Sequence, residues 1–82
     1  MRIHDIVKAF ADIGFKTSLN DNQWIKATTN DVLVVFYDYV LAWASPSLQF
    51  TLAYNNIVSI RKTDSGILQV ILKDNQSLEV RL

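Results

Sequence analysis

The chain has 82 residues, half of them hydrophobic, and its eight basic residues balance its eight acidic ones. We expect one domain over residues 1–82, because a chain of this length buries about 60 to 65% of its unfolded surface in one modest core. It contains no cysteine, which excludes disulfides, zinc sites built on thiolates and a cysteine nucleophile. No basic stripe is present that could neutralise a nucleic-acid backbone.

The same features favour a cytoplasmic location. A secreted domain of this size usually relies on disulfides, which this chain cannot form. The opening residues MRIHDIVKAF carry Asp5 and Lys8, so they are not a signal peptide. The longest apolar run is far below the ~18 residues of a membrane span, so we expect no transmembrane segment.

The first predicted element is a helix over about residues 2–13. Asp5 lies in its first turn, where the helix dipole favours an acidic side chain. Gly14 follows the last periodic residue and predicts a left-handed helix end, with Phe15 packing back near Phe10. Helical spacing is found for five hydrophobic residues: Ile3, Ile6, Val7, Phe10 and Ile13.

Only strands are predicted after this helix. Short clusters of Asn, Asp, Ser, Pro and Gly recur along the chain, and such clusters are typical of turns. The segments between them are rich in β-branched and aromatic residues, which favour strands. We expect strands at about residues 15–19, 23–29, 32–37, 39–44, 48–54, 57–62, 67–73 and 77–82.

A predicted two-residue turn over residues 30–31 sets the register of one hairpin. It places Ala27 opposite Val34 on one face of the hairpin. On the reverse face it places Trp24 opposite Tyr37, so this hairpin carries large apolar side chains on both faces.

The final hairpin is predicted to have a three-residue loop over residues 74–76, which sets Leu72 opposite Leu78. A two-residue loop would mix apolar and polar side chains on each face, so the longer loop is favoured. One face is then apolar, with Leu68, Val70, Leu72, Leu78, Val80 and Leu82. The other face is polar, with Gln69, Lys73, Glu79 and Arg81.

The most apolar segment is residues 32–44, VLVVFYDYVLAWA, in which Asp38 is the only charge. Its apolar residues occupy odd and even positions alike, and successive strand residues point to opposite faces of a sheet. Both faces therefore need cover, which predicts a partner or a second copy. We interpret Asp38 as part of a tight turn over residues 37–40; the alternative is a buried functional carboxylate with a raised pKa.

No constellation of catalytic or metal-binding residues is present. His4 is the only histidine, and we place it on the surface, without a nucleophile or an orienting partner. The carboxylates have no spacing typical of a metal site, and two glycines cannot form a phosphate-binding loop. We therefore expect that the protein is not an enzyme and that it has no catalytic residue, metal or cofactor.

Aromatic residues are the remaining candidates for function. Amphipathic rings anchor many protein interfaces, although each ring taken alone could instead pack in the core. One small domain offers too little interior for two apolar sheet faces and an apolar helix stripe, so we expect the set as a whole to contribute to an interface. The candidate interaction surface consists of Trp24, Tyr37, Tyr39, Trp43 and Tyr54.

A basic surface for nucleic acid is poorly developed. Bases could stack on Trp24, Tyr37 or Trp43, but single-strand binders combine such rings with a positively charged groove. The acidic residues Asp64, Asp74 and Glu79 lie near the only basic cluster, which comprises Arg61, Lys62, Lys73 and Arg81. We interpret this region as a mixed, solvated face and expect no nucleic-acid partner.

Part of the chain resembles GRAM and bacterial PH-like domains. The similarity covers a first hairpin at residues 34–43, a strand and Asn-Ile-Val step at residues 50–60, and a closing hairpin at residues 68–80. The resemblance implies a bent sheet or barrel without catalytic residues, and basic loops in members that bind lipid. In that family a C-terminal helix closes the barrel, whereas the helix predicted here comes first. An N-terminal helix before bent strands is also similar to Sm-like small barrels, whose glycine-bearing motif this chain lacks.

The sequence therefore predicts an α+β domain in which an N-terminal helix packs on a strongly twisted antiparallel sheet, or plugs a small β-barrel of the PH-like or SH3/Sm-like kind. We expect a small non-catalytic protein-interaction module that is homo-oligomeric and uses an aromatic, apolar β surface. A small accessory or phage-encoded protein would suit this description. The alternatives are a single-stranded nucleic-acid-binding barrel and a PH-like module that binds a lipid or membrane surface.

Overall fold

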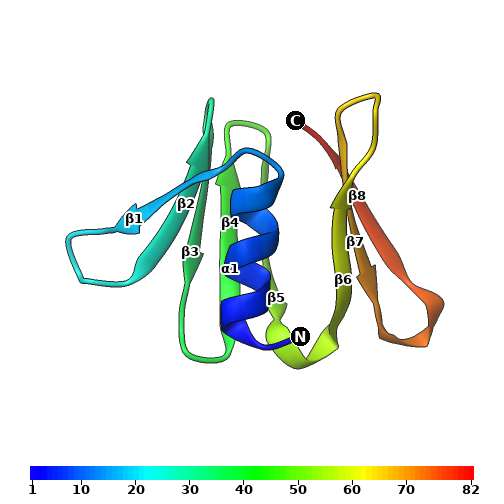
Figure 1. Ribbon diagram of the computed structural model, residues 1–82, viewed down its shortest axis with the longest axis horizontal. Coiled ribbons are helices and arrows are strands. Elements are labelled where there is room, and N and C mark those ends of the chain that lie inside the picture. The colour runs from blue at the N-terminus through cyan, green and yellow to red at the C-terminus, as the bar shows by residue number, and fades with distance from the viewer.

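The computed structural model describes residues 1–82 and consists of one helix followed by eight strands (Figure 1). The helix is α1 (Ile3–Asp12). The strands are β1 (Lys16–Leu19), β2 (Ile25–Thr29), β3 (Val32–Phe36), β4 (Val40–Ser45), β5 (Leu48–Ala53), β6 (Ile57–Lys62), β7 (Ile67–Leu72) and β8 (Ser77–Arg81). Two short 3₁₀ turns, η1 (Tyr54–Asn56) and η2 (Lys73–Asn75), precede β6 and β8.

The strands form two antiparallel sheets, and within each sheet consecutive strands pair in order of sequence. β1 to β5 make a five-stranded sheet, β6 to β8 make a three-stranded sheet, and α1 lies between the two (Figure 1). This confirms the predicted α+β fold with its helix first. The barrel alternative is not formed, because the two sheets stay separate and neither closes on itself. The ten residues of α1 fall well short of a helix that could cross a membrane.

α1 ends in the way that its sequence predicts. Gly14 adopts a left-handed φ of 111°, and the backbone N–H of Phe15 donates to the carbonyl of Phe10 at 3.0 Å. The N–H of Gly14 also donates to the carbonyl of Ala11 at 3.1 Å, which completes a Schellman ending. The Phe10 and Phe15 rings then meet edge to face with centroids 5.0 Å apart. Phe10 and Phe15 are thus joined twice, by a backbone hydrogen bond that ends the helix and by a ring contact in the core.

The hydrophobic core lies between α1 and the inner faces of both sheets. Ile6 and Phe10 are the buried residues of the helix, and the Phe10 ring packs edge-on against Phe36 of β3 with centroids 5.6 Å apart. Leu68 and Val70 of β7 enter the same core cluster from the three-stranded sheet. Each large buried side chain contributes about 1.5 to 3 kcal/mol, so α1 joins the two sheets through a shared core.

The hairpin of β7 and β8 differs from its predicted register by two residues. Leu78 lies opposite Val70, not opposite Leu72. The three-residue loop lies over residues 73–75, one position earlier than predicted: residues 74–75 both adopt left-handed φ angles, and the N–H of Leu72 donates to the carbonyl of Gln76 at 2.8 Å. A shift of two residues leaves every side chain on its predicted face, so the apolar face of this hairpin still points inward.

Several long-range hydrogen bonds hold the junction between the sheets. The N-terminal amine of Met1 donates to the carbonyls of Tyr54 at 3.0 Å and Ile57 at 2.8 Å. The Tyr54 hydroxyl donates to the carbonyl of Tyr37, which follows β3. A bulge between Ile57 and Ser59 then redirects the start of β6. The orientation of the second sheet is thus set by contacts to the start of the chain and to the first sheet.

Candidate interaction surface

The five-stranded sheet has one face that no other element covers. α1 and the three-stranded sheet both lie on its inner side, so the opposite side is open (Figure 1). Successive strand residues alternate between the two sides, and on β3 and β4 those on the open side are all apolar. The flanking strands β1, β2 and β5 add polar side chains there: Lys16, Ser18, Lys26, Thr28, Gln49 and Thr51. We call the following apolar set the outer apolar face: Trp24, Leu33, Val35, Tyr37, Val40, Ala42 and Ala44.

Strand register builds this face. The predicted register of the β2–β3 hairpin is confirmed, with Ala27 opposite Val34 on the inner side. On the open side Val35 lies between Lys26 of β2 and Ala42 of β4. Lys26, together with Lys16 of the edge strand β1, thus lies beside a surface of apolar and small side chains on β3 and β4.

Trp24 and Tyr37 form the aromatic end of the outer apolar face. Their ring centroids are 5.2 Å apart at 62°, an edge-to-face pair at the positions that the register predicts. Tyr37 is 38% exposed and Trp24 is half-buried. The side-chain oxygen of Asn20 accepts hydrogen bonds from the backbone N–H groups of Asn22 at 3.0 Å and Trp24 at 2.9 Å, which fixes the loop before β2. The pair is therefore held in place without a partner.

The outer apolar face is densely packed although nothing lies over it. Val35 keeps only 9% of its exposure, yet it does not belong to the core cluster, because it points away from α1. Its cover comes from neighbours on the same face of the sheet. Leu33 remains 39% exposed at the far end. Monomers rarely leave large continuous apolar surfaces of this kind in contact with water.

The turn between β3 and β4 is the one predicted over residues 37–40. The N–H of Tyr37 donates to the carbonyl of Val40 at 2.9 Å, and Asp38 is exposed in the turn. The alternative of a buried functional carboxylate is therefore wrong. Tyr39, at the tip of the turn, is 83% exposed and lies next to the aromatic end of the face in sequence.

Two of the five candidate residues lie in the core instead. Trp43 is 2% exposed, and its ring stacks on Phe50 with centroids 5.4 Å apart. Tyr54 is 6% exposed. Because Tyr37 pairs with Val40 across a two-residue turn, odd positions change face between β3 and β4, which sends Trp43 inward. The candidate set is corrected to Trp24, Tyr37 and Tyr39.

Tyr54 has a structural function at the junction of the sheets. Burial, with a smaller contribution from the Asp38 carboxylate, raises the pKa of Tyr54 to about 12. The neutral phenol is also the form that donates to the carbonyl of Tyr37. The hydroxyl therefore stays protonated and links η1 to the β3–β4 turn; a general acid or base would need a pKa near the working pH.

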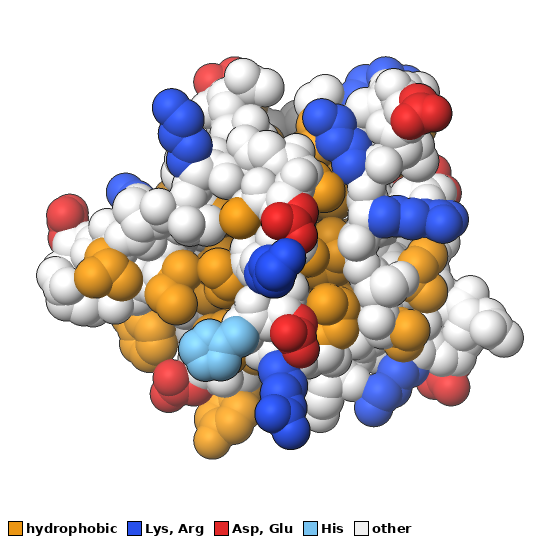
Figure 2. Space-filling view, in the orientation of Figure 1, with side chains coloured by type: hydrophobic (Ala, Val, Ile, Leu, Met, Phe, Trp, Pro, Cys, Tyr) orange, Lys and Arg blue, Asp and Glu red, His pale blue; other side chains and the backbone are white.

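The outer face of the three-stranded sheet carries a polar row between two half-buried isoleucines, Ile67 and Ile71. Nε of Arg61 donates to Oε1 of Gln69 at 2.7 Å, and Nε2 of Gln69 donates to Oε1 of Glu79 at 3.2 Å, so a hydrogen-bonded row crosses all three strands. Basic and acidic side chains are also interspersed over the side of the molecule that carries α1 (Figure 2). Neither side presents the single-sign surface that attracts a phosphate backbone.

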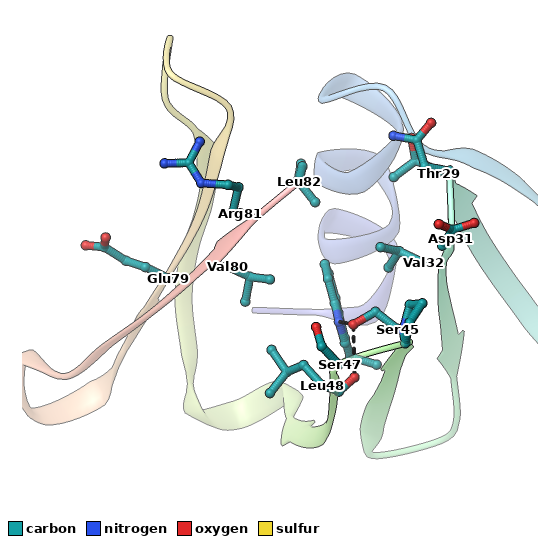
Figure 3. A pocket seen from close by; sticks show the side chains of 13 residues that line it. Thr29, Asp31, Val32, Ser45, Ser47, Leu48, Glu79, Val80, Arg81 and Leu82 are labelled. Carbon is teal, nitrogen blue, oxygen red and sulfur yellow. Dashed lines mark hydrogen bonds between the residues drawn. The ribbon is translucent and has the colours of Figure 1, made fainter.

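The hollows in the surface contain no assembled reaction centre. One cavity of about 490 Å³ lies between the start of α1, the β3–β4 turn and η1, and its lining includes His4 and Asp38. A second cavity, of about 460 Å³, lies between β8 and the β2–β3 and β4–β5 turns (Figure 3). A third, of about 500 Å³, continues the second as a furrow between β5 and the start of β8. No three His, Asp or Glu side chains gather closely enough to hold a metal ion. His4 is exposed, without a hydrogen-bond partner of its own among the side chains.

Sequence reasoning missed the smaller members of the outer apolar face: Leu33, Val35, Val40, Ala42 and Ala44. In residues 32–44 apolar residues occupy odd and even positions alike, which indicates apolar side chains on both faces of the sheet. Only the strand register shows which of them share a side with Trp24 and Tyr37. No protein-family model, curated protein or solved structure matches this chain. Its function is therefore inferred from its own surface.

Proposed function

We propose that this protein is a non-catalytic interaction module that binds protein through its outer apolar face and is homo-oligomeric. The observation that carries this proposal is the edge-to-face pair of Trp24 and Tyr37 at the end of an uncovered apolar sheet face. Such rings supply a large contact area at a small cost in side-chain freedom, which is why they dominate many interfaces. Tyr39 is a third, highly exposed ring at the tip of the β3–β4 turn, where it lines the cavity at the start of α1.

A second copy suits this face in charge and in shape. The strands carry two charges on this side, Lys26 of β2 and Lys16 of the edge strand β1, and β3 and β4 carry none. Two copies that meet over β3 and β4 therefore face little electrostatic repulsion. The aromatic end is bulky, whereas Ala42 and Ala44 make a low strip along β4. In a two-fold arrangement the rings of each copy can rest on the small residues of the other.

The other two candidate functions have less support. Trp24 and Tyr37 could stack bases, but a stacking platform needs a charged track to retain the strand. Two lysines on this side, Lys16 and Lys26, do not make a continuous track. A PH-like module that binds lipid would need basic loops, and the loops of this chain mix acidic with basic or uncharged residues.

Light scattering tests the proposal through the mass of the particle. We expect the wild-type chain at ~100 μM to have a mass of two or more chains, as mass action favours for an interface of this kind. The double variant Trp24→Ser with Tyr37→Ser should have a smaller mass than the wild type while keeping its strand content in circular dichroism. A wild-type mass of one chain would overturn the homo-oligomer.

The matched control removes an exposed apolar side chain from the other sheet. Val58 is 55% exposed at the bulge of β6, so Val58→Ser makes a comparable chemical change far from the outer apolar face. Its mass should equal that of the wild type. Equal losses of mass in this control and in the double variant would show that the aromatic pair has no specific function in the contact.

A further inference from the structure

The molecule has four edge strands, and β8 is the one whose charges are suited to a second copy. Natural sheets protect their edges with lysine, bulges or short strands. β1 is short and carries Lys16, β6 carries the bulge after Ile57, and β5 has no charge that would select a register with another strand. β8 is regular over its whole length and carries Glu79 and Arg81 two residues apart.

The free edge of β8 presents an identifiable set of backbone groups. β8 pairs only with β7, and the N–H of Leu82 donates to the carbonyl of Gly66 at 3.0 Å, just beyond the ladder. Hydrogen bonding alternates along an antiparallel strand, so Leu82 and Val80 direct their backbone groups to β7. The N–H and carbonyl groups of Glu79 and Arg81 therefore point to the free edge, where no strand receives them.

We propose that β8 pairs antiparallel with β8 of a second copy, about a two-fold axis at Val80. This register places Glu79 of each copy opposite Arg81 of the other, and these are the residues whose backbone groups face the free edge. Opposite charges directly across a strand pair stabilise it, and like charges destabilise it. A register shifted by two residues in either direction would set Glu79 against Glu79 or Arg81 against Arg81.

Side chains on both sides of β8 fit this pairing. Glu79 and Arg81 are exposed and project away from the cavity beside the strand, whereas Val80 and Leu82 point into it (Figure 3). Lys8 and Asp12 form the only ion pair within the chain, so the guanidinium of Arg81 has no acidic partner.

The apolar side chains of the added strand would be covered by the furrow beside β8. In the two-fold register the second copy's side chains of Leu78, Val80 and Leu82 all fall on the apolar side, toward the furrow. That furrow is lined by apolar residues of β5 and β7, including Leu48, Phe50 and Leu72. Edge pairing would therefore extend the sheet and cover apolar surface in one step.

A disulfide test measures the register directly. Val80 lies on the two-fold axis, in a pair without mutual hydrogen bonds, where the Cα atoms are about 4.5 Å apart, within disulfide range. The chain has no cysteine of its own, so Val80→Cys introduces a single thiol. Mild oxidation should convert this variant into a covalent dimer. Ser77→Cys on the same strand should remain uncrosslinked, because its two copies would lie about 20 Å apart. Failure of Val80→Cys to crosslink, or equal crosslinking of both variants, would overturn the register.

Charge reversal tests the partner. Glu79→Arg or Arg81→Glu alone sets like charges together at both ends of the two-fold pair, so each should weaken this contact about tenfold or more, measured by sedimentation. The double swap, Glu79→Arg with Arg81→Glu, restores opposite charges and should restore the association. Lys62→Glu, a charge reversal at the other edge of the sheet and outside the hydrogen-bonded row that reaches Glu79, should have no effect. A swap that behaves like the single reversals would exclude a second copy as the partner of β8.

This contact goes beyond the proposed function, because it lies on the other sheet. The variant with Trp24→Ser and Tyr37→Ser should lose the contact of the outer apolar face and still form the disulfide at position 80. Conversely, Glu79→Arg should leave the contact of the outer apolar face intact. The two proposals can therefore fail separately, and with both contacts present the particle contains more than two chains.

Discussion

Both sheets bury an apolar inner face against α1, but their outer faces differ. The five-stranded sheet turns Trp24, Tyr37 and Val35 outward, whereas the three-stranded sheet turns out a hydrogen-bonded row that includes Arg61 and Glu79. The inner faces of both sheets are apolar because they form the core with α1. An apolar outer face has no such explanation in the folded monomer, and for that reason it points to a partner.

The largest effect should come from the core that the two sheets share. Phe10→Ala removes a ring that is 1% exposed and packs against Phe15 and Phe36, so it should lower the free energy of unfolding by about 3 to 5 kcal/mol. Lys8→Ala breaks only an exposed ion pair with Asp12 and should cost less than ~0.5 kcal/mol. Urea denaturation measures both. Similar losses from the two variants would mean that α1 is not the element joining the sheets.

The contrast between the outer faces can be tested with one introduced charge. Ala42→Glu places a carboxylate in the middle of the outer apolar face, and Ser59→Glu places one on the outer face of the three-stranded sheet. Neither should change stability by more than ~1 kcal/mol, because both positions face away from the core. Self-association should weaken about tenfold or more for Ala42→Glu alone, since a buried unpaired charge is costly. Sedimentation at several concentrations distinguishes the two variants.

Local chemistry made most of the fold predictable. The end of α1 follows from Gly14 and Phe15, and the β2–β3 register follows from a two-residue turn that allows one pairing. The predicted β7–β8 register was wrong by two residues because the three-residue loop lies over residues 73–75, with left-handed φ angles at 74 and 75, instead of over residues 74–76. The apolar pattern does not distinguish the two loops, because both place the same side chains on each face. The faces of that hairpin were still correct, since a shift of two preserves them.

The candidate surface was harder to predict than the fold. Trp43 and Tyr37 are both odd-numbered, yet the turn over residues 37–40 reverses the parity and separates them onto opposite sides. The predicted turn over residues 37–40 already implied this separation. It becomes visible only when Tyr37 is paired with Val40 and the pairing is continued along both strands. Division of the strands into two sheets was not predictable, because it depends on the course of the chain through η1 rather than on any one strand.

A moderate effect is expected at the junction of the two sheets, where Tyr54→Phe removes the hydrogen bond to the carbonyl of Tyr37. The loss should be about 1 kcal/mol at neutral pH. The pKa of Tyr54 is raised to about 12 from its ordinary value of 10.0, so the folded chain holds this proton more tightly than the unfolded chain. Its stabilising contribution is therefore complete below pH 10 and is lost as the pH rises through about 12.

Denaturation midpoints between pH 9 and about 12 separate this contribution from other titrations. The wild type should lose stability more steeply than Tyr54→Phe across that interval. Parallel curves for the two proteins would show that the tyrosine titrates equally in the folded and unfolded chains. In that case the junction would be held by the bonds from Met1 alone.

The smallest effect, none at all, is expected from nucleic acid. The rings have no continuous basic track beside them: Trp24 and Tyr37 are on the outer apolar face, where Lys16 and Lys26 are isolated charges on β1 and β2. Arg61 and Arg81 belong to the other sheet, where Glu79 lies on the same face. Stacking contributes about 1 to 3 kcal/mol per base, but it needs a charged track on the same surface. A single strand of about 20 nucleotides should therefore leave the tryptophan fluorescence unchanged at physiological salt. Micromolar binding that weakens with added salt and disappears in Trp24→Ala would mean that the aromatic end of the outer apolar face serves bases rather than protein.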